Sequence, residues 1–136
     1  MWKPWITDKT SRRRQSATLD LRAELSRALQ QGRLIEALEI YELVEQRKPD
    51  EPRWPHRKGD LLHRMGRERD ALRAYERATY LYSARGFDTR AAATARLMLE
   101  IDPSKGDVLD RVNRVAQRRL RKQRRVEIQF GVRRPN

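Results

Sequence analysis

The sequence predicts an all-α protein, a short solenoid of antiparallel helix pairs that stack side by side. One observation is a set of four positions that recur 34 residues later: Gly32, Ala37, Tyr41 and Val44 return as Gly66, Ala71, Tyr75 and Ala78. The other is that apolar side chains near these positions keep helical spacing, as in Leu21, Leu25, Ala28 and Leu29. Such a unit cannot bury its apolar face alone, so neighbouring units must stack.

Each recurring residue has a physical reason to be there. Glycine ends a helix in a tight turn, because a residue without Cβ tolerates a positive φ. Ala37 and Ala71 let two helices approach closely, and Tyr41 and Tyr75 follow one turn later on the same face. The pattern therefore predicts helix, turn and helix, twice over.

Read in order, the chain predicts about six helices. The first begins near Thr18 and ends before Gly32, and prolines at 49, 52 and 55 mark the start of the third. The second to fifth helices are expected over residues 34–47, 53–66, 69–84 and 89–101. A last helix is expected to begin at Ser104. This last helix has an apolar side and is expected to cap the domain. We therefore divide the chain into an N-terminal arm (1–17), a helical domain (18–125) and a C-terminal tail (126–136).

The tail carries a different pattern. Val126, Ile128, Phe130 and Val132 alternate with polar residues or glycine, which is typical of a strand. An isolated strand cannot satisfy its backbone groups inside an all-helical domain. We therefore expect a mobile tail that a partner orders, with Ile128 and Phe130 as its anchors.

The repeated positions resemble the tetratricopeptide repeat, a helix–turn–helix unit with a period of 34. Pro49 stands at the end of the first unit and Gly59 at a small-residue position in the second, as in this family. Gly86, Ala91 and Pro103 form a contracted third match, in which segment 69–85 serves two units. The first helix departs from the pattern, since Leu25 and Ala28 replace the usual small and aromatic residues. The match covers roughly residues 18–103.

The resemblance implies a protein-binding adaptor whose first helices line a groove for peptides. Mapped onto this chain, the groove residues are Arg22, Arg53, His56, Arg57, Asp60, His63 and Arg64. The Lys/Asn set with which some relatives hold a terminal carboxylate is missing here. The arginines favour an acidic peptide, although arginines on a helix surface often only solvate it.

The net charge of +13 lies at the two ends of the chain. Segment 1–17 has five basic residues and one acidic, segment 111–136 has ten and one, and the region between is balanced. The candidate anion-binding residues are Arg118, Arg119, Arg121, Lys122, Arg124 and Arg125. They favour an acidic protein surface or, as the alternative function, non-specific binding to the phosphates of a nucleic acid.

Other functions find little support in the sequence. There is no cysteine, and no nucleophile elbow, phosphate loop or zinc-protease motif, so we expect a non-enzyme without cofactors. His56, Asp60 and His63 share a helical face, but three ligands are few for a structural metal site, so no metal is expected. No leader or membrane-spanning run is visible, which predicts a cytoplasmic protein.

The N-terminal arm contains two further candidates. Trp2 and Trp5 stand in a polar segment and are expected to anchor the arm, either on this domain or on a partner. Ser16 follows two arginines at the spacing of a basophilic kinase site, just before the first helix. The sequence names neither the partner nor an oligomeric state.

Overall fold

The computed structural model describes residues 20–131, and every regular element in this range is helical. A first helix over residues 20–30 is followed by α2 (Leu34–Arg47), α3 (Arg53–Arg64), α4 (Glu68–Ala84), α5 (Asp88–Ile101), the short 3-10 turn η1 (Pro103–Lys105) and α6 (Gly106–Phe130). The predicted all-α class is confirmed, and the bounds expected for the second helix, 34–47, are those observed.

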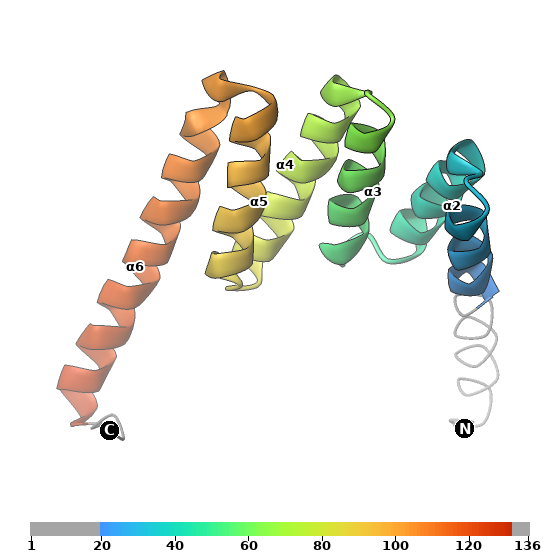
Figure 1. Ribbon diagram of the computed structural model, residues 1–136. Helices are drawn as coiled ribbons and strands as arrows, with labels where there is room; N and C mark the ends of the chain where they lie inside the picture. Colours follow the sequence, from blue (N-terminus) through green and yellow to red (C-terminus); the bar gives the residue numbers. More distant parts are fainter. Residues whose placement is uncertain (1–19, 132–136) are drawn as a thin grey trace, which may run out of the picture.

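The helices pack against their neighbours in chain order, as a short helical repeat requires (Figure 1). α4 contacts α3 on one side and α5 on the other, and α6 lies against α5 with a smaller contact to α4. α4 therefore packs between its two neighbours in the chain, and the expectation that segment 69–85 serves two repeat units stays a prediction. α4 is the central helix of the described chain, and the burial of seven of its side chains reflects this position.

One turn is used three times between these helices. Gly32, Gly66 and Gly86 have φ values of 69°, 73° and 80°, the left-handed region that glycine enters without a steric cost. In each turn the residue after glycine donates its N–H to a carbonyl five residues earlier, at 2.9 Å in all three cases. This is the hydrogen-bond pattern of a Schellman cap. The third glycine therefore makes the same turn as the first two, although it comes only 20 residues after Gly66.

Close approach of α3 and α4 depends on Gly59. A Cβ built on Gly59 would lie 2.7 Å from two ring carbons of Tyr75, closer than real Cβ atoms come to any neighbour. Ala71, one turn before Tyr75, is completely buried, as are Ala37 and Ala78. Small residues thus occupy the crossings, as the sequence pattern predicts.

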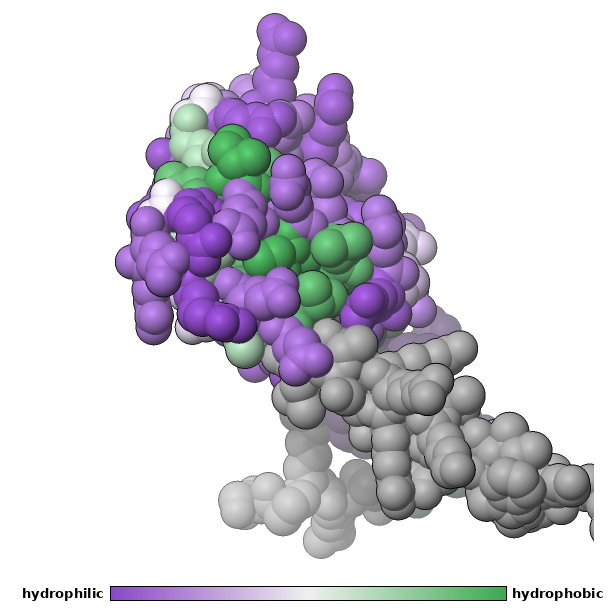
Figure 2. Space-filling view, turned by 90° about the vertical axis from the view of Figure 1, so that its right-hand side faces the viewer, coloured by the Kyte–Doolittle hydropathy of each residue, from purple (hydrophilic) through white to green (hydrophobic). Residues whose placement is uncertain are grey.

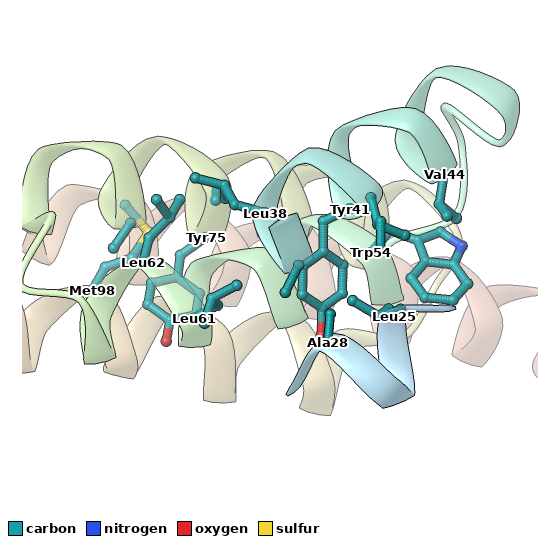
Figure 3. Close-up of a cluster of buried hydrophobic side chains, with 14 of the residues drawn as sticks. Leu25, Ala28, Leu38, Tyr41, Val44, Trp54, Leu61, Leu62, Tyr75 and Met98 are labelled. Carbon is teal, nitrogen blue, oxygen red and sulfur yellow. The ribbon is translucent and has the colours of Figure 1, made fainter. Parts of the chain in front are cut away.

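Larger side chains fill the space around these crossings (Figure 3). Trp54 is 2% exposed and lies between Leu25 of the first helix and Val44 of α2. Its ring centroid is 6.4 Å from that of Tyr41. Full burial of a side chain of this size contributes about 3 kcal/mol to folding. Trp54 therefore connects the first helical pair to the second.

The strand expected at the C-terminus is wrong over residues 126–130, which are the last turn of α6. The alternation gave a wrong prediction because Val126 and Phe130 are four residues apart, a spacing that places them on one face of a helix as well as on one face of a strand. A helix satisfies its own backbone groups, whereas a strand needs a neighbour, and no strand exists in residues 20–131. α6 ends at Phe130 and is capped by Gly131, with φ 64°, so the boundary placed at 125 falls inside a helix.

The opposite end of the molecule is formed by the first helix and α2. Figure 2 shows this end, where small apolar patches are separated by a largely hydrophilic surface. Ile35 and Leu43 of α2 are the large apolar side chains of this helix that are exposed. Exposed residues scattered in this way are ordinary for a globular surface.

Replacing Gly59 by alanine should destabilise the fold. Helix propensity favours alanine by about 1 kcal/mol, but overpacking against the ring of Tyr75 costs about 1–3 kcal/mol, so we expect a net loss of up to about 2 kcal/mol. Urea unfolding followed by circular dichroism measures it. Gly106→Ala is the matched control, since its added Cβ would lie an ordinary 3.9 Å from Leu99. Equal stability of the two variants would contradict the tight crossing.

Candidate partner-binding surfaces

Helix α3 carries six of the seven predicted groove residues, and two of them hold α3 to α4. Asp60 accepts a hydrogen bond from the Tyr75 hydroxyl at 2.6 Å. Nδ1 of His56 lies 3.1 Å from the Tyr82 hydroxyl, and its ring meets the rings of Tyr75 and Tyr82 edge-on. These side chains are occupied within the fold, so their main role is to hold neighbouring helices together.

His63 lies apart from this pair. Its Nδ1 is 3.4 Å from a carboxylate oxygen of Glu68, at the start of α4, and half of its side chain is exposed. His56 and Asp60 instead contact tyrosines further along α4. Within residues 20–131 no three His, Asp or Glu side chains converge on a point that a metal ion could occupy.

The predicted arginines divide into two groups. Arg22 and Arg53 stack on Trp54, with guanidinium carbons 5.3 Å and 5.0 Å from the ring centroid. Arg57 and Arg64 are exposed and have no ion-pair partner in the described part of the chain. They are seven residues apart and share one face of α3. Of the predicted groove, these two cations are the ones free to bind a partner.

Burial changes the acidity of three tyrosines near this surface. Burial raises the pKa of Tyr75, and its hydrogen bond to Asp60 raises it further. Burial also raises the pKa of Tyr41, where the Arg57 guanidinium opposes the rise, and the pKa of Tyr82, where the Arg90 guanidinium opposes it most. All three hydroxyls therefore stay protonated to higher pH in the folded protein than in the unfolded chain.

The second candidate surface is the C-terminal part of α6. Arg119 is clamped: it donates to a carboxylate oxygen of Asp88 at 2.5 Å and to the backbone carbonyl of Ser83. These partners are at the start of α5 and the end of α4. α6 continues past this point for residues 120–130, which we call the overhang, and Figure 1 shows it projecting beyond the N-terminal end of α5.

The overhang is amphipathic. Val126 and Phe130 continue the helical face on which Val112 and Arg119 pack against the domain. Phe130 is 70% exposed, and no helix of the described chain covers it. The cations lie mainly on the other side of the helix. Five cations of α6 are exposed and have no ion-pair partner among residues 20–131, namely Arg118, Arg121, Lys122, Arg124 and Arg125.

The structure therefore separates the six predicted anion-binding residues, because Arg119 has a structural role and the other five are free.

Ile128, a predicted anchor, is 83% exposed on the side of the helix opposite Val112 and Phe130. Trp2, Trp5 and Ser16, with the arm 1–17, lie outside the described residues, as does Val132. Trp54 was not among the predicted residues, although its spacing of seven and eight residues to Leu61 and Leu62 places all three on one helical face.

Comparison of the sequence with protein-family models gives no match, and a search of curated proteins also gives none. Among the helices described, none combines the length and the apolar character that crossing a bilayer demands. The assignment of function therefore depends on the surfaces above.

The pKa shift of Tyr75 predicts a loss of stability at alkaline pH. Its stabilising effect is complete below pH about 10, where the unfolded phenol is still protonated, and declines above it as the unfolded state releases its proton first. Tyr75→Phe should cost about 1 kcal/mol at pH 7, through the lost hydrogen bond, and flatten the decline above pH 10. Urea unfolding at pH 7 to 11 measures both effects. Tyr80→Phe, at a 69% exposed ring, is the control. An equally steep alkaline decline in Tyr75→Phe would contradict this role.

The clamp predicts different outcomes for two adjacent arginines. Arg119→Gln should lower the free energy of unfolding by about 1 kcal/mol, because the ion pair and the backbone hydrogen bond are lost together. Arg118→Gln removes the same charge from an exposed site and should leave stability unchanged. Thermal unfolding of both variants tests this, and an equal effect would place Arg119 among the free cations.

Proposed function

We propose that this chain is a non-enzymatic adaptor that binds an acidic partner protein, chiefly through the overhang of α6. The observation that supports it most is the pairing, on one projecting helix, of an uncovered apolar face with a cationic one. Phe130 and Val126 offer the apolar contact, and five free cations offer the charge. An amphipathic helix of this kind suits a partner that presents both an apolar groove and carboxylates.

Arg57 and Arg64 of α3 provide a second, weaker contact in this proposal. They are the part of the predicted groove that the fold leaves free, and their charge favours the same acidic partner. Membership of the tetratricopeptide repeat family is also part of the proposal. It is supported by the glycine turn that occurs three times and by the Gly59–Tyr75 crossing. The cytoplasmic location expected from the sequence stays a prediction.

The alternative function is non-specific binding of nucleic acid. The five free cations of α6 favour it, since a phosphate backbone needs little more than clustered positive charge. This function would not use the apolar face, because no aromatic platform for stacking bases accompanies the cations in the described overhang; Phe130 is the only aromatic residue there. The adaptor function therefore requires the apolar side chains of Val126 and Phe130, whereas binding of nucleic acid does not.

Two variants separate these functions. One replaces the five free cations of α6 by glutamine, and the other is Val126→Ser with Phe130→Ser. Fluorescence anisotropy measures binding of a labelled amphipathic Glu/Leu helical peptide and of a labelled DNA duplex. For an adaptor we expect both variants to weaken peptide binding by about tenfold or more, which corresponds to about 1.4 kcal/mol. DNA binding should be weak and should depend on the cations alone.

The result that favours the alternative is tight duplex binding that falls steeply with salt and ignores the serine substitutions, together with no binding of the peptide. Arg57→Gln with Arg64→Gln, on α3, measures the second contact and should weaken peptide binding less than the α6 variants do. If that variant weakens peptide binding more than the α6 variants do, α3 is the main contact. Circular dichroism verifies that each variant keeps its helical content.

A further inference from the structure

A cleft of about 600 Å³ lies between α4 and α6, on a surface that neither candidate site uses. Its walls are mostly apolar and include Ala84 of α4 with Val108, Val112 and Val115 of α6. The two helices flank α5, which keeps them apart while α6 diverges from the domain (Figure 1). A concave, largely apolar cavity of this volume between helices is typical of small-molecule sites.

One polar group in this cleft has no partner within the protein. Thr79 is 3% exposed, lines the cleft, and its hydroxyl makes no hydrogen bond. Thr94 on α5 shows how the same side chain is satisfied elsewhere in this fold, since it donates to the carbonyl of Arg90 at 2.8 Å. A buried hydroxyl without a partner is unfavourable, and the Thr79 hydroxyl is itself covered, so an acceptor in the cleft would relieve this cost once the side chain rotates the hydroxyl toward the opening.

The rim of the cleft is cationic. Arg77 and Arg119 are engaged with backbone carbonyls, but two other arginines are only loosely paired. Arg73 is 4.0 Å from Asp70 and its side chain is 83% exposed, while Arg111 is 3.7 Å from Asp107 and 3.8 Å from Glu76. An anionic group at the rim would therefore find two cations that can reorient toward it.

The arm 1–17 and the segment after α6 are basic themselves, which disfavours the chain's own ends as occupants.

We propose that the α4–α6 cleft binds a small amphipathic anion, with an apolar body against the valines of α6, an anionic head at Arg73 and Arg111, and a hydrogen bond to Thr79. A medium-chain carboxylate represents this chemical class. The site is independent of the adaptor function, because the overhang and the free arginines of α3 take no part in it.

Decanoate, used below its micelle concentration, is the probe. Backbone NMR should show chemical-shift changes centred on the residues of α4 and α6 that line the cleft, and decanoate should raise the melting temperature. Thr79→Val should raise the melting temperature of the free protein, because it removes an unpartnered hydroxyl, and weaken decanoate binding by about tenfold. Thr94→Val, which removes a satisfied hydroxyl, should leave decanoate binding unchanged.

The charge requirement has its own comparison. Arg73→Gln with Arg111→Gln should weaken decanoate binding and leave binding of decanol, its uncharged counterpart, unchanged. The proposal is overturned if decyltrimethylammonium binds as well as decanoate, if shift changes fall outside the cleft, or if Thr79→Val destabilises the free protein. The last result would mean that the hydroxyl is already satisfied by the fold or by water.

Discussion

The contact between Gly59 and the ring of Tyr75 sets the geometry on which the rest of the structure depends. Because no side chain intervenes, α3 and α4 come close enough for Tyr75 to donate to Asp60 and for Tyr82 to meet His56. These polar contacts fix the rotation of α3, which in turn directs Trp54 into the first helical pair. A larger residue at position 59 would separate the helices and weaken each of these contacts.

The free surfaces follow from the same arrangement. α4 is covered on both sides, so it offers little to a partner beyond the edge that borders the α4–α6 cleft. α6 is the last described helix, and no other helix among residues 20–131 covers its outer face. Arg119 attaches it where α4 ends and α5 begins, and the eleven residues after this clamp project from the domain. Unpaired cations and uncovered apolar side chains are therefore concentrated on α6.

Much of the fold was predictable from local signals, because helical spacing, prolines and turn glycines each report on their own neighbourhood. Gly86 makes the same turn as Gly66, and α2 has its expected bounds, for this reason. The candidate site was less predictable, since it depends on which neighbour a side chain meets. His56 and His63 share a face in the sequence, yet one bonds to Tyr82 and the other faces Glu68. The structural role of Arg119 could not be distinguished from the exposed position of Arg118 without knowing where α5 begins. The strand predicted at 126–130 was wrong because the same spacing also fits a helix.

A solenoid core held by the α3–α4 crossing thus carries a helix whose last eleven described residues, 120–130, are free of it. Amide hydrogen exchange tests this claim residue by residue along one chain. The strongest protection is expected around Gly59 in α3 and Tyr75 in α4. In α6, protection should hold through Arg119 and fall sharply over residues 120–130, because an isolated helical end frays. Protection of residues 120–130 equal to that of α4 in the monomer would show instead that this end of α6 packs against the rest of the protein.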